Sequence, residues 1–248
     1  MPSLNSEKRS SAPPPPVIVI TGASQGIGAA IAHEFAHRGP CTLALLARNA
    51  AALRQVAAQC QACPGVRAEI FPCDLTDPIA VERVTDAVTG GLGPVDILIN
   101  NAGQFEGAPF LEFSLADFDR MLAVNLRSVF LVSQPFASGM AKRNRGEIVN
   151  ICSVASLQAH PGGTGYCAAK AGLLGLTRVM REELKEHGIR VTAVLPGATF
   201  TPSWEGAGVA PERMMPAADV ARTVVDLTRL SRRTVVEEIV LRPLAGDL

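Results

Sequence analysis

The sequence predicts an α/β fold in which a doubly wound, mostly seven-stranded parallel sheet is flanked by helices. Short apolar, β-branched runs alternate with longer segments whose apolar residues recur at helical spacing. Glycines gather where the first apolar run gives way to the first helical segment. The chain has 248 residues, of which 48% are hydrophobic, so it is long enough for one α/β unit with a large core.

The first half of the chain alternates strand and helix. Strands are predicted over 17–20, 42–46, 68–71 and 95–99, with helices over 27–37, 50–61 and 79–88 between them. Gly39 and Pro40 end the first of these helices. Because each strand is separated from the next by a helix, the strands are expected to run parallel.

The second half continues the pattern with longer helices. A helical region is predicted over 115–142, with a local break or kink at Pro135. Strands over 147–151, 189–195 and 235–241 and an amphipathic helix over 172–187 complete the sheet. No repeat or linker interrupts the chain, so residues 17–248 are expected to form a single Rossmann-type domain.

Residues 1–16 are predicted to form a disordered, proline-rich tail. They hold charged residues and serines followed by four prolines, and they lack the apolar centre of a signal peptide. No later stretch reaches the roughly 20 unbroken apolar residues of a membrane span. Lys plus Arg equals Asp plus Glu at 23 each, so no bulk charge favours nucleic acid or a membrane surface. We therefore expect a cytoplasmic protein with a small-molecule partner.

The six cysteines do not resemble a secreted disulfide framework in a chain of this length. Cys60 and Cys63 form a C-x-x-C pair, but no second pair or histidine cluster completes a zinc site. Buried or incidental thiols are therefore favoured over a metal or redox site, and no metal is expected.

The first strand ends in a glycine-rich turn, T-G-A-S-Q-G-I-G at 21–28, that opens the first helix. Glycine permits a tight turn and close approach of a pyrophosphate, and the helix N-terminus supplies unpaired N–H groups. An ordinary turn could carry the same residues, but its place on the first strand of a βαβ series favours a nucleotide site. The expected contacts here are Gly22, Ser24, Gln25, Gly26, Ile27 and Gly28.

The end of the second strand indicates which dinucleotide is bound. An acidic residue about 20 positions past the turn would bind the adenosine ribose and repel a 2′-phosphate. Ala47 occupies this position, followed by Arg48 and Asn49, so an arginine is available to pair with phosphate. A solvated surface arginine is the alternative. The sequence thus favours NADP (NADPH) over NAD.

In open α/β sheets the ligand binds in a crevice at the carboxyl ends of the strands, and two further strand ends are expected to line this crevice. After the third strand come Asp74 and Leu75, where Asp74 could accept a hydrogen bond from the adenine amino group or cap the next helix. The fourth strand ends in N-N-A-G, of which Asn101, Ala102 and Gly103 are expected to contact the cofactor and neighbouring backbone.

Tyr166 and Lys170 are one helical turn apart on the same face, and Tyr166 is the only tyrosine. Carbonyl reduction needs a proton donor at the oxygen that gains charge as hydride reaches carbon. A lysine ammonium beside a phenol favours the phenolate, so the pair suits this task. Ser153, just after a strand, could donate to the same oxygen. Alone, a helical tyrosine and lysine would more often be packing and solvent residues.

In their order along the chain, these motifs resemble the short-chain dehydrogenase/reductase family. The resemblance covers nearly everything after the tail and rests on the turn at 21–28, the N-N-A-G, and Ser153, Tyr166 and Lys170. It implies that Tyr166 and Lys170 also contact the cofactor, and that Asn125 completes the catalytic set by holding a water linked to Lys170. Asn125 could equally mark a helix kink, and the two roles are compatible. A homodimer or homotetramer built partly by the long helices is also implied.

The resemblance also assigns the segment after the sixth strand. It implies a nicotinamide-facing turn at Pro196 and Gly197, with Thr199 and Thr201 as further cofactor contacts. A substrate lid is expected near 198–215, where Trp204 and two methionines offer apolar cover. Surface helix packing is the alternative for these apolar residues.

The implied function is an NADP(H)-dependent oxidoreductase that transfers a hydride between nicotinamide and a carbonyl or alcohol. Local similarity at 47–49, 201–204 and 233–243 favours bacterial sepiapterin reductase-like members. A 3-oxoacyl carrier-protein reductase would share the catalytic residues and differ in the lid and the carrier-docking surface. A catalytically silent dinucleotide sensor is the third possibility, although no expected catalytic residue is missing.

Overall fold

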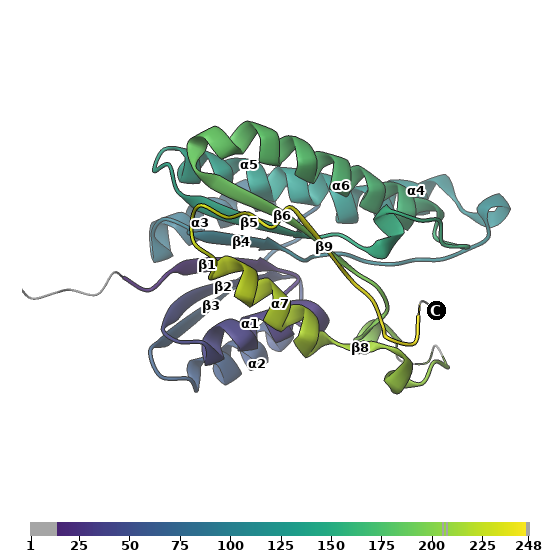
Figure 1. Cartoon of the computed structure of the whole chain (residues 1–248), viewed down its shortest axis with the longest axis horizontal. Helices are drawn as coiled ribbons and strands as arrows, with labels where there is room; N and C mark the ends of the chain where they lie inside the picture. Colours follow the sequence, from purple (N-terminus) through teal and green to yellow (C-terminus); the bar gives the residue numbers. More distant parts are fainter. Residues whose placement is uncertain (1–13, 205, 207, 247–248) are drawn as a thin grey trace, which may run out of the picture.

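A seven-stranded parallel sheet forms the centre of the computed structural model, which describes residues 14–204, 206 and 208–246 (Figure 1). Its strand order is β3-β2-β1-β4-β5-β6-β9. The predicted doubly wound α/β fold is confirmed. Most of the predicted tail, residues 1–13, lies outside the described residues, whereas residues 14–16 lead directly into β1.

The elements alternate along the chain much as the hydrophobic pattern predicts. The sheet strands are β1 (Val17–Thr21), β2 (Cys41–Ala47), β3 (Val66–Pro72), β4 (Ile97–Asn100), β5 (Gly146–Ile151), β6 (Ile189–Pro196) and β9 (Glu238–Leu241). The α-helices are α1 (Gly26–His37), α2 (Ala50–Gln61), α3 (Pro78–Leu92), α4 (Leu115–Leu122), α5 (Ser128–Ala141), α6 (Thr164–Leu184) and α7 (Ala217–Thr228).

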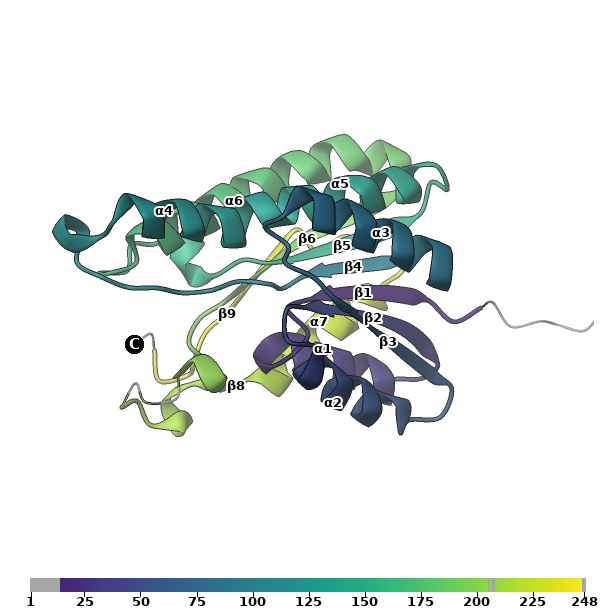
Figure 2. The same ribbon diagram turned by 180° about the vertical axis from the view of Figure 1, so that it is seen from behind.

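Helices cover both faces of the sheet (Figures 1 and 2). Helices α1, α2 and α7 lie on one face, and α3, α4, α5 and α6 lie on the other. Along β1, Ile18 and Ile20 are buried with the α1, α2 and α7 layer, whereas Val17 and Val19 are buried with the opposite core. Successive side chains of a strand point to opposite faces, so a strand buried on both sides must be continuously apolar.

The strand order reverses between β1 and β4. The chain runs outward from β1 through β2 to β3, then returns to the other side of β1 as β4. Ligands of open α/β sheets bind outside the carboxyl ends of the strands at such a reversal. Because β1 and β4 are hydrogen-bonded neighbours, the glycine-rich turn and the N-N-A-G segment emerge side by side there.

Several elements differ from the predicted ones. Helix α6 begins at Thr164 rather than 172, so Tyr166 and Lys170 lie in its first two turns. Helix α7 was not predicted, and the predicted lid contains a short parallel pair, β7 (Thr199–Phe200) with β8 (Met215–Pro216). The last strand is shorter, because 235–237 lie outside β9.

The long helical region is interrupted by a π-helical turn at Ala123–Arg127, between α4 and α5. Pro135 lies inside α5, so the predicted alternative of a break at this residue was wrong, whereas a kink there stays a prediction. The π-helical turn forms where a side chain competes for a backbone carbonyl. In a regular α-helix the Met121 carbonyl would accept the backbone N–H of Asn125. Here it accepts a hydrogen bond from the side-chain Nδ2 of Asn125, at 3.1 Å.

The cysteines are free thiols. Cys60 is buried, and this burial raises its pKa to about 12, whereas Cys63 is half-buried. Within the described ranges, no three His, Cys, Asp or Glu side chains gather closely enough to hold a metal ion. In the same part of the chain, no helix has both the length and the apolar character needed to cross a membrane.

Candidate active site

A cleft of about 510 Å³ opens at the carboxyl ends of the central strands. Most of the predicted site residues line it: Gly22, Gln25, Gly26, Ile27, Asn101, Ala102, Gly103, Asn125, Ser153, Tyr166, Lys170, Pro196, Gly197, Thr199 and Thr201. Six others lie outside this lining: Ser24, Gly28, Arg48, Asn49, Asp74 and Leu75. Segments that follow four strands of the sheet, β1, β4, β5 and β6, therefore meet at one site.

The glycine-rich turn has a backbone that requires glycine. Gly22 and Gly26 have φ values of 64° and 57°, in the left-handed region. A Cβ on Gly28 would lie 2.3 Å from the Gly22 carbonyl oxygen. Gln25, the residue before α1, makes no capping hydrogen bond through its side chain. The first N–H groups of α1 therefore have no side-chain cap at the edge of the cleft, where they are suited to an anion.

The N-N-A-G segment holds this turn from the neighbouring strand. Thr21 Oγ1 accepts hydrogen bonds from the backbone N–H groups of Asn101 and Ala102, at 2.9 and 3.0 Å. Asn101 Nδ2 donates to the carbonyls of Thr21 and Gly22, at 3.0 and 3.2 Å. The two segments, about 80 residues apart in the chain, thus form one structural unit.

A buried polar network lies beneath the cleft. Asn100 Nδ2 donates to Ser133 Oγ and to Asn150 Oδ1, both at 2.8 Å. Asn150 Nδ2 donates in turn to Thr177 Oγ1 at 2.9 Å. The network joins β4 and β5 to α5 and α6, so the helix that carries Tyr166 is tied to the sheet.

The residues predicted to bind adenosine lie at the exposed ends of β2 and β3. Arg48 is exposed, and Asn49 accepts the Ala52 N–H at 3.1 Å, which caps α2. Asp74 accepts hydrogen bonds from the N–H and hydroxyl of Thr76, which hold the pKa of its carboxyl below the ordinary value. Asp77 rather than Asp74 caps α3. Cofactor contact by these residues stays a prediction.

Ser153, Tyr166 and Lys170 meet in the cleft. Lys170 is buried, and its Nζ donates to the Ile151 carbonyl at 2.8 Å while lying 5.6 Å from the centre of the Tyr166 ring. Ser153 is also buried, and its Oγ accepts the Ala155 N–H at 3.1 Å. The arrangement places a phenol, an ammonium group and a hydroxyl around one small volume.

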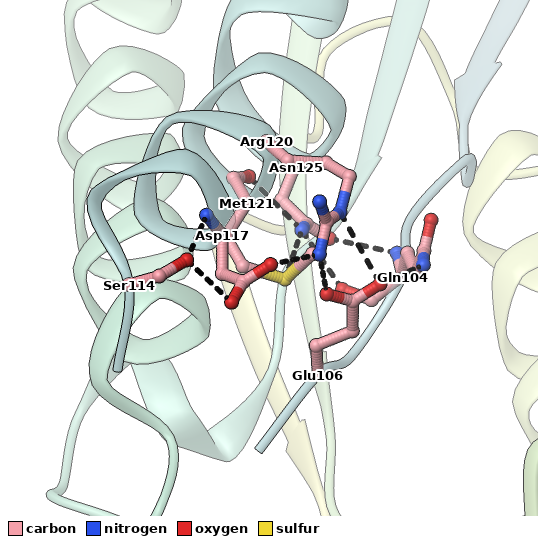
Figure 3. Close-up of polar contacts among 7 residues, drawn as sticks. All are labelled: Gln104, Glu106, Ser114, Asp117, Arg120, Met121 and Asn125. Carbon is pink, nitrogen blue, oxygen red and sulfur yellow. Dashed lines mark hydrogen bonds and ion pairs between the residues drawn. The ribbon is translucent and has the colours of Figure 1, made fainter. Parts of the chain in front are cut away.

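Asn125 approaches the same group from the π-helical turn. Its Oδ1 accepts the Gln104 N–H at 3.1 Å, and its Nδ2 donates to the Gln104 carbonyl at 2.9 Å (Figure 3). A Cβ on Gly103 would lie 2.9 Å from Asn125 Oδ1 and 3.6 Å from Lys170 Nζ. Asn125 thus holds backbone beside Lys170, and its role in holding a water stays a prediction.

A family model for short chain dehydrogenases matches residues 16–209. The chain belongs to this family. As a short-chain dehydrogenase it is an oxidoreductase. Sepiapterin reductase from Chlorobaculum tepidum is 35% identical over 237 residues, covering 93% of this chain and 97% of that protein. A 3-oxoacyl-acyl-carrier-protein reductase from Thermotoga maritima is 34% identical over 225 residues, with 90% and 87% covered.

The fold of this short-chain dehydrogenase also matches solved structures. An alcohol dehydrogenase from Thermococcus sibiricus, complexed with 5-hydroxy-NADP, superposes with a TM-score of 0.87 at 30% sequence identity. The match covers 93% of this chain and 97% of that chain. The sequence and structure comparisons therefore agree on the family.

Several residues of this short-chain dehydrogenase line the cleft without having been predicted. The Phe105 ring packs edge-on against Tyr166, 5.3 Å between ring centres, and lies 5.9 Å from the His160 ring. Gln104 precedes it and also lines the cleft. Cys152 lies in the wall, where burial raises its pKa to about 11 against the opposing effect of Lys170. The place of Gln104 and Phe105 directly after N-N-A-G was the available signal.

Proposed function

We propose that this short-chain dehydrogenase is an NADP(H)-dependent carbonyl reductase that also oxidises the corresponding alcohol. The convergence of Ser153, Tyr166 and Lys170 in one cleft carries the proposal. The same cleft reaches the uncapped N-terminus of α1. A proton-transfer group and an anion site therefore share one cavity, as reduction with a dinucleotide requires.

The residues present fit a phosphorylated dinucleotide. The N–H groups of the glycine-rich turn would hold the pyrophosphate, Arg48 would pair with the 2′-phosphate, and Thr199 and Thr201 would hold the nicotinamide end. Gly26 lies close to Thr201, since a Cβ there would be 3.2 Å from that side chain. The 5-hydroxy-NADP complex of the Thermococcus relative supports this choice. When bound, the reduced cofactor supplies the hydride.

The side chains of the cleft donate the proton that the reduction requires and stabilise the charge that remains. Tyr166 gives its phenolic proton to the substrate oxygen, which gains negative charge as the carbonyl is reduced. Ser153 Oγ already accepts a backbone N–H, so its own proton is available to donate to that oxygen. The Lys170 ammonium, fixed by the Ile151 carbonyl, stabilises the phenolate that Tyr166 leaves behind.

We assign as the substrate a small molecule that carries its carbonyl group on a flat ring system, such as sepiapterin. Phe105, His160 and Trp204 give the cleft an aromatic wall on which a ring can stack. The similarity to sepiapterin reductase over 93% of this chain supports the same choice. A substrate screen that includes pterins and 3-oxoacyl thioesters tests it, with faster turnover of the thioesters as the contradicting result.

Rapid-reaction measurement of hydride transfer in Tyr166→Phe tests the reaction itself. The loss of a general acid lowers the rate by about a hundredfold to ten-thousandfold. NADPH binding should be retained, because phenylalanine keeps the ring. A rate equal to that of the wild type would remove Tyr166 from this role. A silent dinucleotide sensor would instead bind NADPH and oxidise none of it across a panel of carbonyl compounds.

A further inference from the structure

A chain of polar contacts connects the cleft wall to α4 without taking part in the proposed hydride transfer (Figure 3). It begins at Gln104, which lines the cleft, and continues through Glu106 to Arg120 on α4. Asp117 and Ser114 extend it along the first turn of that helix. The chain of contacts therefore ties the loop between β4 and α4 to the helix.

The backbone of Gln104 is fixed at both of its polar groups. Asn125 accepts its N–H at 3.1 Å and donates to its carbonyl at 2.9 Å. Asn125 is itself fully buried in the π-helical turn, where its amide also holds the Met121 carbonyl. Gln104 is consequently held at one place along the cleft.

The side chain of Gln104 is held in one orientation. Its Nε2 donates to Glu106 Oε1 at 2.6 Å. Because a carboxylate only accepts, this contact determines which end of the amide is nitrogen. Arg120 binds the same carboxylate through Nε at 3.2 Å and also through Nη2. The Gln104 oxygen therefore points away from Glu106 (Figure 3), and no donor among the described residues bonds it.

Both chain neighbours of Gln104 lie against the reacting groups. A Cβ on Gly103 would be 3.6 Å from Lys170 Nζ. The Phe105 ring packs edge-on against Tyr166. Gln104 thus lies in the chain between two residues that contact the reacting groups, and it lines the same cleft.

We propose that Gln104 selects substrates that carry a hydroxyl or N–H donor next to the reacting carbonyl. The side-chain oxygen accepts a hydrogen bond from that donor, while Glu106 and Arg120 act as positioning residues that fix the amide. A substrate without the donor leaves the acceptor unpaired once water is excluded, which weakens its binding. The inference rests on the proposed function, because Tyr166 and Ser153 define where the carbonyl lies.

Hydroxyacetone and butanone form a matched pair for the test, since a methyl group replaces the hydroxyl. We expect the wild type to prefer hydroxyacetone by about tenfold in kcat/KM, the value of one hydrogen bond. Gln104→Leu should remove most of this preference by lowering kcat/KM for hydroxyacetone relative to kcat/KM for butanone. Arg120→Gln should reduce the preference partly, through KM for hydroxyacetone rather than kcat.

Gln158→Leu is the matched control. Gln158 also lines the cleft, but its Oε1 accepts a hydrogen bond from Arg242 Nη2 at 3.1 Å. The same substitution there should leave the preference between the two ketones unchanged. Equal kcat/KM values for the two ketones in the wild type, or an unchanged preference in Gln104→Leu, would overturn the inference.

Binding without turnover separates this inference from the proposed function. Trp204, the only tryptophan, lines the cleft, so its emission can report binding of either ketone to the protein saturated with NADP⁺. Preferential binding of hydroxyacetone that Gln104→Leu abolishes supports the inference even if no hydride is transferred, and then only the proposed function fails. Equal binding overturns the inference and leaves hydride transfer standing.

Discussion

Gly28 has no room for a side chain, because a Cβ would lie 2.3 Å from the Gly22 carbonyl oxygen and 2.5 Å from Asn101 Nδ2. We expect Gly28→Ala to reduce the free energy of unfolding by about 3 kcal/mol, because the clash is partly with backbone that cannot rotate away. NADPH binding should weaken as the turn shifts. Chemical denaturation and cofactor titration measure both effects.

Gly90 is the matched control, since it lies in α3 with nothing within 4 Å of its would-be Cβ. Gly90→Ala should raise the free energy of unfolding by about 0.5–1 kcal/mol, because alanine is the better helix former. If Gly90→Ala lowered the free energy of unfolding as much as Gly28→Ala, the turn would have no special requirement for glycine.

Arg48 is expected to determine the preference for NADPH over NADH. Arg48→Ala should weaken NADPH binding about tenfold or more while leaving NADH binding nearly unchanged, because only NADPH carries the 2′-phosphate. Arg54→Ala on α2 removes the same charge from an exposed site and serves as the control. Titration of the wild type should show tighter binding of NADPH, and tighter binding of NADH would contradict the assignment.

At the scale of single residues, local patterns identified the glycine-rich turn and the Tyr166 and Lys170 pair, because one turn of helix or one strand end brings these groups together. Gln104 and Phe105 were missed for the opposite reason. Their meaning depends on Asn125 and Tyr166, which approach from other elements. Their place directly after N-N-A-G indicates that they lie near the cleft, but it does not indicate which groups they contact.

Among the elements, β4, β5, α5 and α6 depend on the buried network of Asn100 and Asn150. We expect Asn150→Leu to reduce the free energy of unfolding by about 2–3 kcal/mol, since Asn100 loses an acceptor and Thr177 loses a donor. Ser133→Ala should cost about 1 kcal/mol, because Asn100 keeps its bond to Asn150. Equal losses in the two variants, measured by denaturation, would contradict a connected network.

Hydrophobic periodicity predicted the strands and most helices, and it failed where tertiary contacts decide. Helix α6 starts eight residues earlier than predicted, because its first turns carry the small and polar residues of the cleft rather than an apolar stripe. Helix α7 was overlooked beside the predicted lid, although it buries Val220 and Val224. The π-helical turn follows from the side chain of Asn125, which no periodicity reveals.

For the whole molecule, the helical layer of α4, α5 and α6 exposes Leu115, Phe130 and Val179 to solvent. We expect two or four copies of the chain to associate through this layer, because exposed apolar side chains favour such contacts. Light scattering should give a mass of two or four times 26.0 kDa.

Phe130→Glu should shift this mass toward that of a single chain, because burying a carboxylate in an interface is unfavourable. Ile79→Glu makes the same change at another exposed apolar position, at the start of α3, and should leave the mass unchanged. A wild-type mass of 26.0 kDa would refute the assembly.

The π-helical turn at Ala123–Arg127 also adds one residue between α4 and α5 without changing their angular relation. Each residue of an α-helix advances the chain by about 100° around its axis, and a π turn accommodates one residue more than an α-helical turn. Deleting one residue here would therefore allow a continuous α-helix in which α4 and α5 still present the same faces. Met121 and Val129, both buried now, would then be two helical turns apart and would both still face the interior. What the extra residue determines is the position of Asn125, which holds the backbone of Gln104, so we expect a single-residue deletion here to impair activity more than stability.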